Sequence, residues 1–253
     1  MYGKKARDET GLTVAEGPAA VLCALESSVE IRMIVVAEDF LSTDKGQEVR
    51  EAIARRTDLR EVFIVSRSLY NRMSDTASPQ GVLCVIPWPF RNQPPKVWSQ
   101  DLIVVGVDIQ DPGNVGTLVR ASSAVGVTQV IFCGNTADPF SPKAIRSSAG
   151  AVFATQVRTA EDPLKVVRGL AALGIKFFRA VPRDGVPPWK VEFKSPCAVL
   201  LGNEAGGLRE EILELPGGED VSIPMPGGTE SLNVAMACSM ILYEALRQRM
   251  EVL

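Results

Sequence analysis

The sequence predicts an α/β protein built from a small N-terminal domain and a larger C-terminal domain. Short runs rich in Val and Ile alternate with helical patterns along most of the 253 residues, which is typical of strands covered by helices. Four prolines occur between Pro87 and Pro95. Because proline fixes φ and lacks a backbone donor, this segment should be an extended connector. We therefore assign the two domains to residues 1–90 and 100–253.

The N-terminal domain contains the alternating strand and helix patterns of a small α/β unit. An apolar helical stretch follows Gly17 and extends to about Leu25. Further along, apolar runs predict three strands, and one segment between them predicts a second helix. The strands are expected at 31–36, 61–65 and 81–86, and the helix at 47–56.

The C-terminal domain begins with a continuous β-branched run at 102–107, which predicts a strand buried on both faces of a parallel sheet. A loop then leads to a helix from about Asn114 to Val125, and Gly126 is a natural stop for that helix. The next strand, at 129–133, completes a βαβ unit. We also expect helices at 163–173 and 231–249, and strands at 176–180, 197–201 and 221–223.

Composition excludes several classes of protein. The chain has no histidine, and its five cysteines lie far apart without a Cys-x-x-Cys pair. This excludes zinc fingers, His-based catalytic triads and His-ligated metals, and it favours a reduced, cytosolic protein. No apolar run approaches the roughly 20 residues needed to cross a bilayer, and no charged leader precedes a hydrophobic stretch. Membrane and secreted proteins are therefore disfavoured.

The charge pattern leaves two interpretations open. The net charge of −3 argues against a protein that coats nucleic acid indiscriminately, since such binding needs neutralised phosphates. A cluster of arginines in the N-terminal domain is compatible with a local RNA-binding face, or with a solvated helix face balanced by nearby acidic residues. The cluster comprises Arg50, Arg55, Arg56, Arg60, Arg67 and Arg72.

The first of three chemically informative segments surrounds the start of the helix at Asn114. This side chain can cap free backbone N–H groups, and the neighbouring glycines let the backbone approach a partner closely. Arg120 lies six residues further on, in an otherwise apolar helix. A lone Arg there needs a partner, and an ion pair with Asp108 or Asp111 is the structural alternative to a chemical role.

The other two segments are loops rich in Gly and Pro. The segment 200–208 follows a predicted strand, at the place where open α/β sheets bind ligands, and its spacing fits neither GxGxxG nor a P-loop. The segment 223–233 precedes the final helix, and Ser231 is placed to cap that helix. Asn233 would then lie inside the first turn, where Asn is a mediocre helix former, and this favours a functional role.

Together the three segments resemble the ordered motifs of the SpoU (TrmH) family, the RNA 2′-O-ribose methyltransferases of the SPOUT class. The resemblance covers essentially the whole C-terminal domain, including the segment 143–150. The N-terminal domain is similar to the family's ribosomal-protein-like RNA-binding domain, through less specific motifs at 7–17 and 78–81.

The resemblance implies a fold and a cofactor. The C-terminal domain is expected to be an α/β trefoil-knot (SPOUT) domain with a parallel sheet, an exception to the rule against knots. The N-terminal domain is expected to be a small ribosomal-protein-like α/β domain. The family binds S-adenosyl-L-methionine among the knot loops and uses no metal. By resemblance, the cofactor is held by Gly202, Ile223, Met225 and Leu232.

The resemblance also implies catalytic residues for methyl transfer to a ribose 2′-OH. Arg120 corresponds to the residue proposed to activate the hydroxyl. Because a guanidinium stays protonated, the role we assign to it is a clamp on phosphate that steadies the developing alkoxide. Asn114 is expected to position the ribose or Arg120, while Glu204, Ser231 and Asn233 complete the polar lining.

Family members form homodimers through catalytic-domain helices, so the helix after Asn114 and the final helix are the expected dimer surfaces. An apolar stripe at helical spacing on the final helix supports this expectation, although simple core packing explains the same pattern. The stripe consists of Leu232, Ala235, Met236, Ser239 and Leu242.

The expected substrate is structured RNA in the cytoplasm. Ribosomal RNA is favoured because front domains of this kind in the family grip rRNA hairpins. A transfer RNA methyltransferase and a non-catalytic RNA-binding protein remain alternatives, and the intact motif residues speak against the second. A nicotinamide enzyme would need a GxGxxG segment, which is missing. The target nucleotide depends on the shape of a folded loop, which a linear sequence does not encode.

Overall fold

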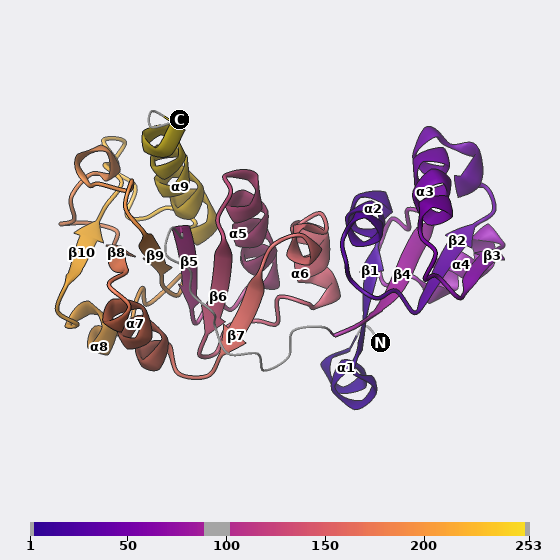
Figure 1. Ribbon diagram of the computed structural model, residues 1–253, viewed down its shortest axis with the longest axis horizontal. Helices are drawn as coiled ribbons and strands as arrows, with labels where there is room; N and C mark the ends of the chain where they lie inside the picture. Colours follow the sequence, from indigo (N-terminus) through magenta and orange to yellow (C-terminus); the bar gives the residue numbers. More distant parts are fainter. Residues whose placement is uncertain (1–2, 89–101, 251–253) are drawn as a thin grey trace. The chain divides into compact units, whose positions relative to one another are not determined.

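The computed structural model of the protein describes residues 3–88 and 102–250. Contacts divide the chain into two compact units (Figure 1). Of the described residues, the first unit contains 3–88 and, in addition, the segment Asp138–Ala154. The second unit contains the other described residues.

The first unit is built on a mixed four-stranded sheet with the order β1-β4-β2-β3. β4 is antiparallel to both of its neighbours, and β3 is parallel to β2. Side-chain caps begin two of the helices, because Thr43 and Ser66 accept hydrogen bonds from backbone N–H groups of the first turn. The strands are β1 (Leu12–Glu16), β2 (Met33–Ala37), β3 (Val62–Val65) and β4 (Val82–Pro87), and the helices are α1 (Lys4–Thr10), α2 (Pro18–Glu26), the 3₁₀ turn η1 (Phe40–Ser42), α3 (Asp44–Arg55) and α4 (Arg67–Met73).

The segment Asp138–Ala154 packs with this first unit although it lies beyond β4 in the sequence. It contains α6 (Pro142–Ser147) and the 3₁₀ turn η2 (Ala151–Phe153). Thr13 of β1 donates to the Phe140 carbonyl at 2.7 Å, and Arg7 donates to Asp138 at 2.8 Å. Gly150 has φ +86°, and a Cβ there would lie 2.8 Å from the Ala20 backbone, so this close approach requires glycine.

The second unit is built on a six-stranded, fully parallel sheet with the order β10-β8-β9-β5-β6-β7. Its central strands are buried on both faces, as the continuous apolar runs predict. The strands are β5 (Leu102–Val107), β6 (Gln129–Cys133), β7 (Val157–Ala160), β8 (Lys176–Ala180), β9 (Cys197–Leu201) and β10 (Gly218–Val221), and the helices are α5 (Pro112–Ala124), α7 (Pro163–Ala172), the 3₁₀ turn η3 (Pro188–Lys190), α8 (Glu210–Leu213) and α9 (Val234–Met250).

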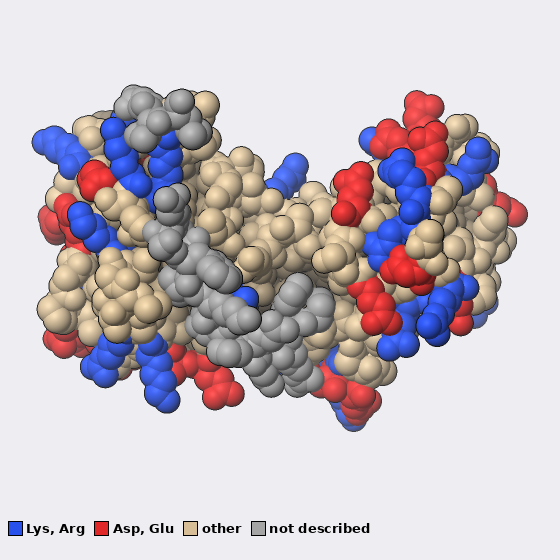
Figure 2. Space-filling view, in the orientation of Figure 1, with Lys and Arg blue, Asp and Glu red and all other residues tan. Residues whose placement is uncertain are grey.

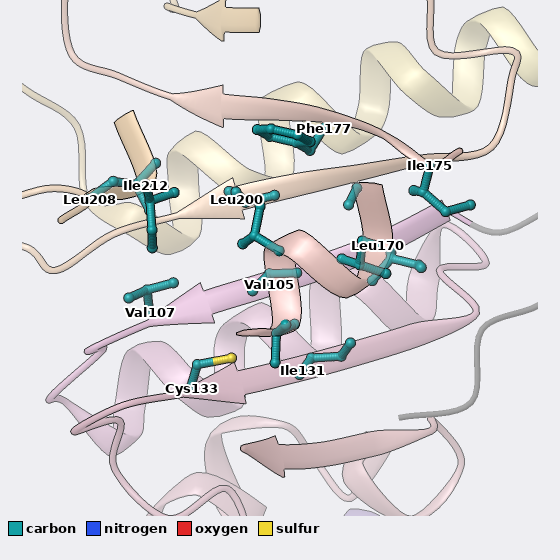
Figure 3. Close-up of a cluster of buried hydrophobic side chains, with 14 residues drawn as sticks. Val105, Val107, Ile131, Cys133, Leu170, Ile175, Phe177, Leu200, Leu208 and Ile212 are labelled. Carbon is teal, nitrogen blue, oxygen red and sulfur yellow. The ribbon is translucent and has the colours of Figure 1, made fainter. Parts of the chain in front are cut away.

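Helices cover both faces of this sheet. On one face, Val105, Ile131 and Leu200 of the strands form a buried cluster with Leu170 of α7 and Ile212 of α8 (Figure 3). On the other face lie α5 and α9, which pack against each other. The sheet and its two helical layers therefore fix the start of α5 and the start of α9 with respect to the strand ends.

Four strands of the second unit, β5, β6, β8 and β9, have the bounds that the sequence predicts. Two expectations are wrong in detail. The strand expected at 221–223 lies at Gly218–Val221, and the final helix begins at Val234, so Ser231 is not its cap. Asn233 accepts hydrogen bonds from the N–H groups of Ala235 and Met236 and takes that position instead.

The arginine cluster of the first unit is partly structural. Arg56 donates to the carbonyl groups of Leu25, Ser27 and Val29 and also binds Asp58. Arg67 forms an ion pair with Asp39. The other members, Arg50, Arg55, Arg60 and Arg72, are exposed and make no side-chain hydrogen bond or ion pair with the part of the chain that is described.

The cysteines behave as small apolar side chains. All five are free, and four of them are buried. Burial raises the pKa of the Cys84 and Cys133 thiols to about 12, which makes them poor nucleophiles. Across the described ranges, no helix is long and apolar enough to span a membrane, and no cluster of Cys, Asp and Glu could hold a metal ion.

Candidate active site

A cavity of about 330 Å³ opens at the carboxyl ends of three neighbouring strands in the second unit. β8, β9 and β10 end at Ala180, Leu201 and Val221, and each of these residues and the loop that follows it line the cavity. The first turns of α9 close it on another side. This is the position where open parallel sheets bind ligands, and the volume is in the range of small-molecule sites.

The glycine-rich loop after β9 folds back on itself in a tight turn. The backbone groups of Asn203 and Gly207 exchange two hydrogen bonds of 2.9 Å, and the Asn203 side chain accepts from the N–H groups of Ala205 and Gly206. A Cβ at Gly202 would lie 2.1 Å from the Gly207 carbonyl carbon. Only glycine fits at Gly202, and the turn presents its backbone to the cavity.

A directed chain of hydrogen bonds links the starts of two helices to this loop. Because the Asn233 oxygen accepts from the backbone of α9, its amide NH₂ is left to donate, and it does so to Oδ1 of Asn114 at 2.9 Å. The NH₂ of Asn114 then donates to Oε1 of Glu204 at 2.8 Å. A carboxylate can only accept, so the orientation of both amides is fixed. The second oxygen of Glu204 makes no hydrogen bond within the described residues.

An ion pair supports the loops on either side of this chain. Asp108, which follows β5, has φ +56°, and its carboxylate accepts two hydrogen bonds from Arg209 at 2.7 and 2.8 Å. These hydrogen bonds hold the pKa of the Asp108 carboxyl below its usual value. The Asp108 carbonyl accepts from the Asn203 side chain at 2.9 Å. Asp108 and Arg209 therefore join the loop after β5 to the loop after β9.

The structure brings together most of the residues that the sequence predicts for the site. Asn114 and Asn233 reach Glu204 through the hydrogen bonds just described. Arg120, on α5, takes no part in these hydrogen bonds. It is exposed and forms no hydrogen bond or ion pair with the described residues. The ion pair with Asp108 or Asp111 that the sequence offers as an alternative is therefore not formed. The predicted residues that line the cavity are Gly202, Glu204, Ile223, Met225, Ser231 and Leu232.

Several residues at the site carry no signal in the sequence. The loop 180–182 and the carboxylate of Glu230 also line the cavity. The Asp108–Arg209 pair joins positions 101 residues apart, and only the assembled sheet makes this visible.

The apolar stripe predicted for dimer contacts is mostly core. Ala235 and Leu242 are buried within the chain, and Leu232 lines the cavity. Of the stripe, Met236 is exposed at 55%, and it is followed along the same helix by exposed Met240 and Tyr243. Core packing therefore explains the inner part of the predicted stripe, and the exposed apolar face consists of one stripe residue, Met236, together with Met240 and Tyr243.

The architecture defines a class: a parallel α/β domain with a loop-lined cavity at the carboxyl ends of its strands and a chain of amide–carboxylate hydrogen bonds beside the cavity. Residues 101–243 match the model of the SpoU rRNA Methylase family, and residues 1–84 match that of the MRM3-like substrate binding domain. The chain belongs to the SpoU rRNA methylase family.

Relatives agree with this membership over nearly the whole chain. An uncharacterized tRNA/rRNA methyltransferase of Synechocystis is 33% identical, over 82% of this chain and 76% of its own. The 23S rRNA (guanosine(2553)-2′-O)-methyltransferase RlmP of Bacillus subtilis is 28% identical, over 96% and 92%. The crystal structure of an AdoMet-bound rRNA methyltransferase from Sinorhizobium meliloti has a TM-score of 0.82 and 29% identity, covering 97% and 91% of the two chains.

The protein is thus an S-adenosylmethionine-dependent rRNA 2′-O-ribose methyltransferase. The residues present fit this cofactor. The cavity combines apolar walls, from residues such as Leu201 and Ile223, with the carboxylates of Glu204 and Glu230. Those carboxylates complement the positive charge of a sulfonium, and the loop backbone offers groups that a flat base can bond.

Proposed function

We propose that this enzyme methylates a ribose 2′-OH of large-subunit rRNA and that residues 100–253 carry out the transfer while residues 1–90 bind the RNA substrate. The action of the Bacillus relative on 23S rRNA and its coverage of nearly the whole chain support the substrate. The match of residues 1–84 to a substrate binding domain supports the division of labour. Free, mostly buried cysteines support a reducing compartment, the cytoplasm.

The cofactor is proposed to lie in the cavity with Gly202, Ile223, Met225 and Leu232 around it. The support is that all four line the same cavity although they come from two loops. When bound, S-adenosylmethionine supplies a methyl group on a positively charged sulfur. Gly202 and its turn supply backbone groups, and Ile223, Met225 and Leu232 supply apolar contacts that exclude water.

The Asn233–Asn114–Glu204 chain is the observation that carries the proposal for the acceptor side. Asn233 holds Asn114, and Asn114 holds one oxygen of Glu204. The other oxygen is left to accept a hydrogen bond from the incoming 2′-OH and so to orient it toward the methyl group. The same oxygen can take the hydroxyl proton as the new oxygen–carbon bond forms and the sulfur–carbon bond breaks. Ser231, which also lines the cavity, adds a hydroxyl that can donate to the substrate or accept from it.

Arg120 is proposed to act as a fixed positive charge toward the RNA. Its guanidinium is exposed and has no partner among the described residues, so it is available for a phosphate. An Arg presents paired donors that match phosphate oxygens, and its charge stabilises a developing alkoxide without accepting the proton.

The proposal also includes a homodimer that uses α5 and α9. Met236, Met240 and Tyr243 are 55%, 46% and 68% exposed and fall on one side of α9 at spacings of four and three residues. A contiguous exposed apolar face of this kind is typical of an interface. A second copy seated on α9 would also come near α5, the helix that carries Arg120.

Calorimetric titration with S-adenosylhomocysteine tests the cofactor site. We expect saturable binding to the wild type and no binding to Leu232→Arg, because the longer charged side chain fills the cavity. Leu173→Arg is the matched control, since Leu173 is 64% exposed and lies outside the cavity. Arg120→Ala should bind S-adenosylhomocysteine normally and lose methyl transfer. A folded wild type that binds none, or a Leu232→Arg variant that binds normally, contradicts the assignment.

A further inference from the structure

An exposed tryptophan lies on the loop between β8 and β9. Trp189 belongs to the turn η3, and 59% of its surface is exposed to solvent. Pro188 and Val191, which lie close to it in the sequence, are buried. The loop therefore has apolar anchors of its own, and the indole is not one of them. A large aromatic side chain held in water offers a flat surface for a partner.

The backbone around Trp189 is fixed by hydrogen bonds to the end of α9. Gln248 donates to the Val191 carbonyl at 3.0 Å and accepts from the Phe193 N–H at 2.9 Å. Arg249 donates to the carbonyls of Phe193 and Ser195. A partner that contacts the indole thus meets a preorganised surface and does not have to order a loop.

The loop that carries Trp189 also carries three positively charged side chains that have no partner among the described residues. The side chains of Arg183, Lys190 and Lys194 are exposed and form no hydrogen bond or ion pair with the described residues. The nearby Glu192 is already engaged by Lys176 and Ser195, which leaves Asp184 as the one unengaged carboxylate of the loop among those residues. Figure 2 shows Lys and Arg side chains gathered over this part of the second unit, beside the end of α9.

The same loop begins at the cofactor cavity. Ala180, Val181 and Pro182 line the cavity, and Arg183 is the next residue. On its way to Trp189 the loop is tied to β10, because Val186 pairs with Val221 and Ser222 donates to the Gly185 carbonyl. The loop that carries the three cations and the indole therefore starts at the wall of the cavity.

We propose that Trp189, together with Arg183, Lys190 and Lys194, forms a platform for the RNA substrate, in which an unpaired base stacks on the indole and the flanking phosphates contact the three cations. This inference rests on the proposed function. Stacking platforms flanked by cations bind single-stranded nucleic acid, and unpaired bases are what proteins read in folded RNA. The platform holds RNA that projects beyond the nucleotide being methylated.

The test compares Trp189→Leu with Trp189→Phe for binding to protein-free bacterial 23S rRNA, measured as Kd. The leucine keeps an apolar side chain and loses the stacking face, whereas the phenylalanine keeps a ring. We expect Trp189→Leu to raise Kd about tenfold and Trp189→Phe to restore most of the affinity. Affinity for S-adenosylhomocysteine should be unchanged in both variants, which shows that they are folded.

The charges are tested by the triple variant Arg183→Gln, Lys190→Gln and Lys194→Gln. Its plot of log Kd against log salt should lose about two units of slope, because three phosphate contacts are removed. Lys165→Gln with Arg168→Gln on α7 is the control pair and should leave the slope unchanged. Equal RNA affinity of wild type, Trp189→Leu and the triple variant overturns the platform and would assign this face to a protein partner. A wild type that binds no S-adenosylhomocysteine overturns the proposed function itself.

Discussion

At the scale of single residues, the Asn233 side chain makes two kinds of hydrogen bond that substitutions can separate. Its side-chain oxygen caps α9, and its NH₂ holds Asn114. Aspartate is an equally good cap, but it has no NH₂ to donate. Substitution by Asp therefore tests the hydrogen bond to Asn114 alone, whereas substitution by Ala removes the cap as well.

We expect Asn233→Asp to keep the thermal stability of the wild type and to lose methyl transfer, because the cap is retained and the link to Asn114 is broken. Asn233→Ala should lose both, with a stability loss of about 1 kcal/mol from the missing cap. Thermal unfolding and a methyl-transfer assay on both variants check this. Full activity in Asn233→Asp would show that the link to Asn114 is dispensable.

Asp108 gives a prediction about pH. Hydrogen bonds from Arg209 lower the pKa of Asp108 in the folded protein. The ion pair therefore stabilises the fold above the unfolded pKa of about 3.9, and this contribution is lost as pH falls through the depressed folded value.

Asp108→Asn keeps the shape and tolerates the positive φ, since Asn adopts that region readily, and it removes the charge. Urea midpoints of wild type and variant should differ at pH 7, and the difference should shrink as pH falls below about 4. Comparing the two proteins cancels the other carboxylates that titrate in this range. A difference that is constant with pH would mean that the pair contributes nothing through its charge.

At the scale of elements, α9 has a buried side and an exposed apolar side. Cys238, Ile241 and Leu242 pack inward, while Met240 and Tyr243 face solvent. Met240→Arg is therefore expected to turn a dimer into a monomer and to leave the fold intact. Sedimentation velocity and thermal unfolding measure the two effects. Leu173→Arg, exposed on the opposite face of the sheet, should remain a dimer. A wild type that sediments as a monomer at micromolar concentration contradicts the dimer.

Elements also explain which parts of the fold could be predicted from the sequence. Strands β5, β6 and β9 are buried on both faces, so their apolar runs have sharp ends. β7 has the sequence Val-Arg-Thr-Ala and is only partly buried, so it has no continuous apolar run. The helices α6 and α8 are very short, so they show no helical periodicity in the sequence. The sequence does not fix the start of α9, because Ser231 and Asn233 are both good caps. The hydrogen bond to Asn114 that distinguishes them joins residues far apart in the sequence.

The candidate site also contains residues that the sequence predicts and residues that it does not. The motif resemblance picks out Asn114, Glu204 and Asn233, which the structure connects by hydrogen bonds. It gives no hint of the Asp108–Arg209 pair, because neither residue has a neighbour in sequence that reveals the other. In the arginine cluster the sequence pattern does not separate structural from exposed side chains. Arg55 and Arg56 are adjacent, yet Arg55 is exposed and Arg56 donates to the carbonyls of Leu25 and Ser27 at the end of α2.

At the scale of the whole molecule, the order of synthesis follows from the place of Asp138–Ala154. This segment completes the first unit, through Thr13 and Arg7 among others. Chains are made from the N-terminus, and domains generally fold as units during synthesis. Here the first unit can complete its fold only after the ribosome has passed residue 154. By then β5, α5 and β6 of the second unit have already been synthesised. The two units therefore mature in overlapping periods, and the first unit is not finished before the second has begun to form.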